Sequence, residues 1–71
     1  MRRFLVDPRN IAGSLATLSG SEAHHIAAVL RLRPESSVEL IDAQGAAYQG
    51  HLESVSNTLV TVRLSARRQE V

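Results

Sequence analysis

The residue types best suited to chemistry in this chain are gathered in one stretch, His25 to Pro34. Arg31 and Arg33 lie at its end, and Pro34 stops any helix there because proline cannot continue the backbone hydrogen-bond pattern. Guanidinium groups bind phosphate through paired hydrogen bonds, and the carbonyl end of a helix favours positive charge. The pattern predicts a small module that docks on phosphate, with His25 as a further polar group one turn or more away.

Charge is distributed unevenly along the 71 residues, although their formal net charge is only +1. The net charge is +3 over residues 1–33, −4 over residues 34–62 and +2 over residues 63–71. All eight basic residues are arginine, which favours bidentate phosphate contacts, although a preference for arginine codons explains the same composition. If the first strand lies beside the end of the helix, the arginines form a basic ridge that can bind nucleic acid.

Other kinds of chemistry find little support in the sequence. The chain has no cysteine, which excludes disulfides and thiolate metal sites and is compatible with a reducing cytosol. His24 and His25 are adjacent, so on a helix they point about 100° apart and do not form a chelating pair. The sequence contains no nucleophile elbow, Walker loop or dinucleotide-binding glycine motif. We therefore expect no catalytic residue, no metal site and no cofactor site in this chain.

Membrane insertion and base stacking are also disfavoured. No apolar run approaches the roughly 18 residues that a membrane span needs. Proteins that read single strands stack bases on exposed aromatic side chains. Phe4 and Tyr48 are the only aromatic residues here, and both fall at predicted core positions. Contacts to the nucleic-acid backbone are therefore expected rather than base stacking.

Short strands and one helix must position these residues. Alternation of apolar and polar residues predicts strands over residues 2–6, 15–18, 38–41, 46–55 and 60–64. Ser19 and Glu22 form a capping-box pattern, and the apolar stripe that follows predicts a helix over about residues 20–31. Gly50, inside a predicted strand, indicates a bulge or a bend. The expected fold class is mainly β, a small barrel of five or six short strands with one inserted helix.

Three stretches together resemble the start of a known protein family. They are Met1–Val6, the segment Glu22–Pro34 with its His-x-x-x-Val-Leu-Arg core, and Ile41–Gly45 followed by Tyr48. They resemble the N-terminal, PUA-like β-barrel domain of the ribosomal RNA small subunit methyltransferase E family. The resemblance implies an RNA-binding domain over residues 1–66, with residues 67–71 as a linker or truncated end.

The same resemblance implies a parent enzyme larger than this chain. In that family, S-adenosylmethionine supplies a methyl group to N3 of a uridine in 16S rRNA, and a C-terminal knotted SPOUT domain performs the transfer. That domain is absent here, and a homodimer through it is expected. The implied partners are 16S rRNA or the small ribosomal subunit, in the cytoplasm and away from any membrane. A packing or dimerisation module and a stand-alone PUA-like RNA-binding adaptor remain alternatives.

The predicted RNA-binding residues follow from the family motif. These residues are Arg3, His25, Arg31 and Arg33, which stand where the family has basic or polar groups, and Arg2, which is added on charge alone. The sequence departs from the family at two turns. Glu35–Ser36 replaces the usual Gly-Asp after proline, and Ala43 replaces a glycine. Both departures lie outside the helix motif.

Overall fold

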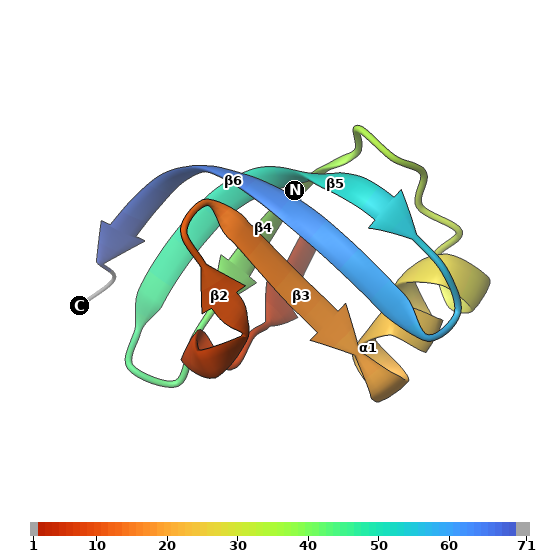
Figure 1. Cartoon of the computed structure of the whole chain (residues 1–71), viewed down its shortest axis with the longest axis horizontal. Helices are drawn as coiled ribbons and strands as arrows, with labels where there is room; N and C mark the ends of the chain where they lie inside the picture. The colour runs from red at the N-terminus through yellow and green to blue at the C-terminus, as the bar shows by residue number, and fades with distance from the viewer. Residues whose placement is uncertain (1, 70–71) are drawn as a thin grey trace.

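A six-stranded sheet, curled into a half-barrel with one helical segment at one end, forms the structure (Figure 1). The computed structural model describes residues 2–69, and their side chains through Ser65. The strands are β1 (Arg2–Leu5), β2 (Ile11–Ala12), β3 (Leu15–Ser19), β4 (Ser37–Ile41), β5 (Ala46–Val55) and β6 (Leu59–Gln69). The helical segments are η1 (Pro8–Asn10), α1 (Gly20–His24) and η2 (His25–Val29). The predicted fold class, mainly β with one inserted helix, is confirmed.

The order of strands across the sheet is β1-β4-β5-β6-β3-β2. β1 pairs with β4 in parallel, and every other neighbouring pair is antiparallel. β5 and β6 are the longest strands and form the centre, where they bend the sheet so that its two edges approach the same side (Figure 1). The helical segment packs against β3 and β6.

The core lies inside the curl and follows the alternation seen in the sequence. Apolar side chains on the inner face of the strands are buried, while their neighbours along each strand mostly face outward. The largest fully buried side chains are Ile26, Leu40, Leu52, Val38, Val60 and Val62. Ile26 comes from the helix, so the helix contributes to the same core as the strands. Among the described residues, no helix is long and apolar enough to span a membrane.

The helix differs from its prediction at both ends. Ser19 is the residue before the helix, but its hydroxyl makes no capping hydrogen bond. Gly20 follows with a left-handed φ of 60°, so the chain enters the helix through the glycine and not through a capped serine. The helix also ends at Val29, two residues before the predicted end, because its second half widens into a π-helix.

The strands differ from their predictions at the short and polar segments. Between the first two predicted strands the sequence indicates a loop through Asn10 and Gly13, where the structure has the 3₁₀ turn Pro8–Asn10 and the two-residue strand β2. Such short elements carry no periodic signal. β6 continues to Gln69, because the first half of β5 needs a hydrogen-bonding partner and Ala46 lies opposite Gln69. The bulge expected at Gly50 is confirmed by a register shift between Gln49 and Gly50.

Candidate nucleic-acid interface

The chain leaves the helix through an unusually wide turn. The amide of Leu30 donates to the carbonyl of His25 at 2.8 Å, and the amide of Leu32 donates to the carbonyl of Ile26 at 3.0 Å. Arg31, between them, has a φ of 54°, in the left-handed region that a residue with a side chain adopts at an energetic cost. The left-handed conformation of Arg31 therefore turns the chain away from the helix, which has ended at Val29, before Pro34 is reached.

A tight turn follows over Arg33 to Ser36. The amide of Ser36 donates to the carbonyl of Arg33 at 3.1 Å, and the Ser36 hydroxyl accepts from the Arg33 amide at 3.3 Å. Pro34 is second in the turn, and Glu35 is third with a φ of 77°. A proline followed by a left-handed residue is the arrangement of a type II turn, whose third position favours glycine. The turn forms here with glutamate, at the position where the family resemblance expects glycine.

This turn is fixed to β5 by three contacts. The Glu35 amide donates to the carbonyl of Leu52 at 2.7 Å, and the Leu52 amide donates to the carbonyl of Ser36 at 2.9 Å. The Glu35 carboxylate lies 3.6 Å from Nε2 of His51 on β5. The segment from Arg31 to Ser36 is therefore held against the sheet, although it belongs to no strand or helix.

Two predicted RNA-binding residues project from this fixed segment. Arg31 and Arg33 are exposed on either side of Leu32, which is half-buried against the core. Within residues 2–65, neither guanidinium has a hydrogen bond or an ion pair. His25 is exposed on the helix and makes no side-chain contact of these kinds in the same range. We define Arg31 and Arg33 as the arginine pair.

The N-terminal arginines are placed differently from the prediction. The expected basic ridge requires the first strand beside the last helical turn, but β1 pairs with β4 while the helix packs on β3 and β6. Arg2 lies opposite Val38, at the end of the sheet where the chain enters β4 from the arginine pair. The Arg3 guanidinium donates to the Glu39 carboxylate at 2.6 Å. The prediction of one continuous ridge is therefore wrong, because Arg3 is neutralised by a carboxylate on the neighbouring strand.

The remaining described arginines are also paired with acids. Arg63 makes a bidentate contact with Glu53, at 2.7 and 2.9 Å. Arg9 contacts Asp7 with both its amide and its guanidinium. The guanidinium hydrogen bond, followed by that of the amide, lowers the pKa of the Asp7 carboxyl. The Arg63–Glu53 pair depends on the pairing of β5 with β6, whereas the Arg9–Asp7 pair joins residues only two apart. Sequence reasoning that counts net charge by segment misses both.

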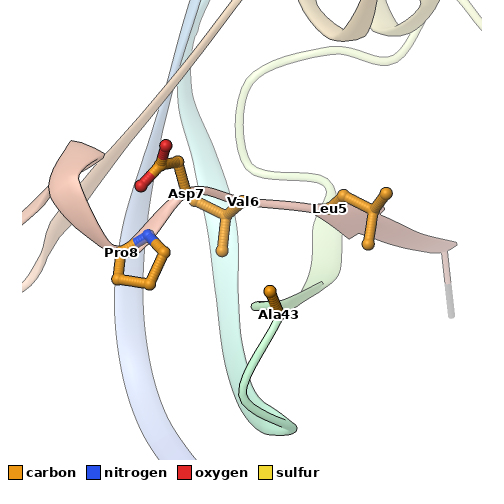
Figure 2. Close-up of a pocket in the computed structure, with 5 residues that line it drawn as sticks. All are labelled: Leu5, Val6, Asp7, Pro8 and Ala43. Carbon is orange, nitrogen blue, oxygen red and sulfur yellow. The ribbon is translucent and has the colours of Figure 1, made fainter.

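A second feature lies at the opposite end of β1, where Leu5, Val6, Asp7, Pro8 and Ala43 line an open depression of about 360 Å³ (Figure 2). Its only charged group, Asp7, is already bonded to Arg9. S-adenosylmethionine, which the family resemblance implies for the parent enzyme, does not fit a hollow with no other polar side chain. Over the described part of the chain, no cluster of three histidine, cysteine or acidic residues could hold a metal ion.

A curled six-stranded sheet with one helical segment is the architecture of a small domain of the PUA-like class. Residues 18–65 match the family model described as the RNA methyltransferase PUA domain. The chain belongs to the family of RNA methyltransferase PUA domains, as the resemblance in the sequence implied. No curated protein sequence matches it.

Solved structures with the same fold come from several bacteria. A predicted RNA methyltransferase from Thermotoga maritima is 20% identical, with a TM-score of 0.86, over 100% of this chain and 32% of that chain. A putative methyltransferase from Legionella pneumophila, in complex with S-adenosylmethionine, is 22% identical with a TM-score of 0.83, over 96% of this chain and 28% of that chain.

One further structure carries the name of the family that the sequence resembles. It is a ribosomal RNA small subunit methyltransferase E from Neisseria gonorrhoeae, bound to S-adenosylmethionine. It is 26% identical, with a TM-score of 0.80, over 96% of this chain and 28% of that chain. The present chain thus spans less than a third of the length of the three structures.

Proposed function

We propose that this chain is the rRNA-recognition domain of a longer enzyme, an S-adenosylmethionine-dependent methyltransferase that modifies N3 of a uridine in 16S rRNA. Membership of the RNA methyltransferase PUA family carries the proposal. Further support comes from the fold shared with the Neisseria gonorrhoeae enzyme, whose name gives ribosomal RNA as the substrate. The enzyme acts in the cytoplasm on the small ribosomal subunit or its rRNA.

Within this proposal, the domain binds RNA through its backbone phosphates. The arginine pair provides two exposed guanidinium groups that no carboxylate within the described residues neutralises. His25 on the helix and Arg2 on β1 add a polar and a positive group, and Arg3 contributes least because Glu39 already binds its guanidinium. Phosphate contacts fix the position and register of a protein on nucleic acid but carry little sequence information. Choice of the uridine therefore belongs to the rest of the enzyme.

Catalysis and cofactor binding are assigned to the same remaining part of the enzyme. The depression beside β1 is apolar apart from a paired carboxylate, so it does not fit S-adenosylmethionine. A SPOUT domain that follows the PUA domain would bind the cofactor, transfer the methyl group and form the homodimer contact.

RNA binding is tested by titrating the protein with a fragment of small-subunit rRNA at several salt concentrations. Because binding releases counterions from phosphate, the logarithm of the association constant should fall linearly with the logarithm of the salt concentration. Arg31→Ala and Arg33→Ala should each reduce the slope by about one. No binding, or an affinity independent of salt, would reject the proposal.

The reaction is tested separately with the full-length enzyme. Small subunits that lack the modification are incubated with S-adenosylmethionine carrying a labelled methyl group. The label should appear at N3 of one uridine in 16S rRNA. A label on another base or another ring atom would leave the RNA-binding role intact but would refute the uridine-N3 assignment.

A further inference from the structure

The arginine pair and the apolar depression lie toward opposite ends of the long axis of the domain. In Figure 1 the helix is at one end, whereas the turn that follows β4 and the end of β6 are at the other. The chain measures 32 Å along this axis. The depression of Figure 2 belongs to the end away from the helix, because Ala43, one of its walls, is part of that turn.

The depression is apolar and open to solvent. Leu5, Val6, Pro8 and Ala43 present their hydrocarbon groups to it, and the Asp7 carboxylate points away from Ala43 (Figure 2). Leu5 is 70% exposed, more than any other large apolar side chain within the described part of the chain. Leu5 therefore extends the apolar surface of the hollow toward solvent.

Both walls of the depression are rigid, so the hollow is present before any partner binds. On one side, β1 is paired with β4, and the Val6 amide extends the pairing with a 2.9 Å hydrogen bond to the carbonyl of Ile41. On the other, the buried carboxylate of Asp42 accepts from the amides of Gln44 and Ala46, at 2.9 and 3.0 Å. Preformed apolar hollows bind with little ordering cost.

The path of the chain indicates which partner can reach this hollow. The backbone of Gln69, near the end of β6, lies opposite Ala46, the first residue after the turn that contains Ala43. Any polypeptide that continues β6 therefore starts beside a wall of the depression. The related methyltransferases of known structure are at least three times as long as this chain, which covers 28–32% of them.

We infer that the depression binds an apolar side chain from the catalytic part of the same methyltransferase polypeptide, close to the segment that follows β6. The inference rests on the proposed function only in that the domain is part of a longer methyltransferase. RNA is a poor occupant, because the lining carries a single charge and that charge is negative. Five lining residues are also few for association with a second copy, because a stable interface usually takes about 20–30 residues from each partner. A tethered segment avoids that requirement because the tether raises its effective concentration.

The test measures thiol accessibility at two positions of the full-length methyltransferase that contains this domain. The described domain has no native cysteine, so Leu5→Cys and the control Val29→Cys each introduce a single reporter. Val29 is a matched control because it is 59% exposed and lies at the helical end. Both variants are treated with a maleimide, and the reaction rate of the unsubstituted protein is subtracted as background. Position 5 should react at least about tenfold more slowly than position 29, and the difference should disappear in denaturing urea.

Each other outcome overturns the inference. Equal rates at the two positions would show that the depression is open in the full-length protein. Protection lost on dilution would identify a second copy as the occupant, and protection that requires added rRNA would identify RNA. The proposed function is judged independently by the rRNA titration. Protection without rRNA binding would refute the function but not this contact, and rRNA binding without protection would refute only the contact.

Discussion

Arg31 adopts a backbone conformation that is unfavourable for a residue with a side chain. A residue with a Cβ atom at a φ of 54° is less stable by about 1–2 kcal/mol than in the right-handed region, and glycine is the usual residue just after a helix. Its guanidinium has no partner within residues 2–65 to compensate for that conformation. Strained residues concentrate at functional sites, which agrees with a role of the side chain outside the domain.

Two substitutions at Arg31 separate the backbone from the guanidinium. Arg31→Gly should raise the free energy of unfolding by up to about 1 kcal/mol relative to Arg31→Ala, because glycine adopts the left-handed region without strain. Both variants lack the guanidinium, so both should lose rRNA affinity to the same extent. Urea unfolding and the rRNA titration provide the two measurements. A glycine variant less stable than the alanine variant would contradict the strained conformation.

Glu35 supplies the matched control, since it has a φ of 77° four residues further on. Glu35→Gly relieves a comparable strain without removing a positive charge, so it should stabilise the domain and leave rRNA affinity unchanged or slightly higher. If this variant lost as much affinity as Arg31→Gly, the loss at position 31 would stem from the backbone and not from the guanidinium.

Asp42 is a structural carboxylate with a measurable role in stability. It is 4% exposed and accepts from the amides of Gln44 and Ala46 and from the hydroxyl of Tyr48, the last at 3.1 Å. Asp42→Ala should lower the free energy of unfolding by about 2–4 kcal/mol, because these donors lose a charged acceptor. Tyr48→Phe removes one of the three bonds and should lower it by about 1 kcal/mol. Chemical denaturation checks both, and equal losses in the two variants would contradict this account.

Arg3 should behave as a structural residue more than as an RNA ligand. Its partner Glu39 is only 8% exposed, so Arg3→Ala leaves a nearly buried carboxylate without its guanidinium. We expect a loss of about 1–2 kcal/mol in the free energy of unfolding and a smaller loss of rRNA affinity than in Arg31→Ala. The double variant Arg3→Ala/Glu39→Ala should recover part of the stability. A larger loss of rRNA affinity at position 3 than at position 31 would instead support the basic ridge that the sequence predicts.

The bulge between β5 and β6 depends on a single glycine. A Cβ atom at Gly50 would collide with the carbonyl oxygen of Arg63 on the adjacent strand, where only backbone movement can relieve the contact. Gly50→Ala should therefore lower the free energy of unfolding by about 2 kcal/mol or more. At Gly13, with a φ of 60°, an added Cβ meets nothing within 4 Å, so Gly13→Ala shows the cost of strain alone. Equal losses at both positions, measured by urea denaturation, would contradict a packing role for Gly50.

Strands with clear alternation could be predicted from the sequence, and elements set by tertiary contacts could not. β5 runs from Ala46 to Val55 as predicted, because apolar and polar residues alternate in its sequence and Gly50 marks its bend. Burial follows that alternation only in part, since Ala46, Ala47 and Tyr48 are all buried. The end of the helix is misplaced because Pro34 is the visible stop signal, whereas a π-turn and the left-handed Arg31 end it earlier. The polar end of β6 is missed because pairing with β5 determines it.

The part of the candidate site that is close together in the sequence could be predicted, and the part that depends on tertiary contacts could not. Arg31 and Arg33 follow the helix closely in sequence, so local reasoning places them together on the surface. Arg3 and Glu39 are 36 residues apart, and their ion pair requires the parallel register of β1 and β4, which no local pattern gives. Glu35 at a left-handed turn position is similarly hidden, since glutamate is not a residue type that predicts such a conformation.

The whole molecule separates the arginine pair from the apolar depression, and this separation is itself testable. The two lie toward different ends of a chain that measures 32 Å along its long axis, with no described residue in common. Arg31→Ala/Arg33→Ala should reduce the salt slope of rRNA binding by about two while leaving thermal stability nearly unchanged. Leu5→Ser, at the exposed leucine, should leave that slope unchanged.

Combining the two sets of changes tests their independence. Sites more than about 10 Å apart with no shared partners contribute additively to within about 0.5 kcal/mol. The variant with all three substitutions should therefore bind rRNA as the arginine double variant does, and it should unfold as Leu5→Ser does. Titration and thermal unfolding of the four proteins, measured side by side, complete the cycle. A coupling well above that margin would mean that RNA bound at the helical end also engages the apolar end.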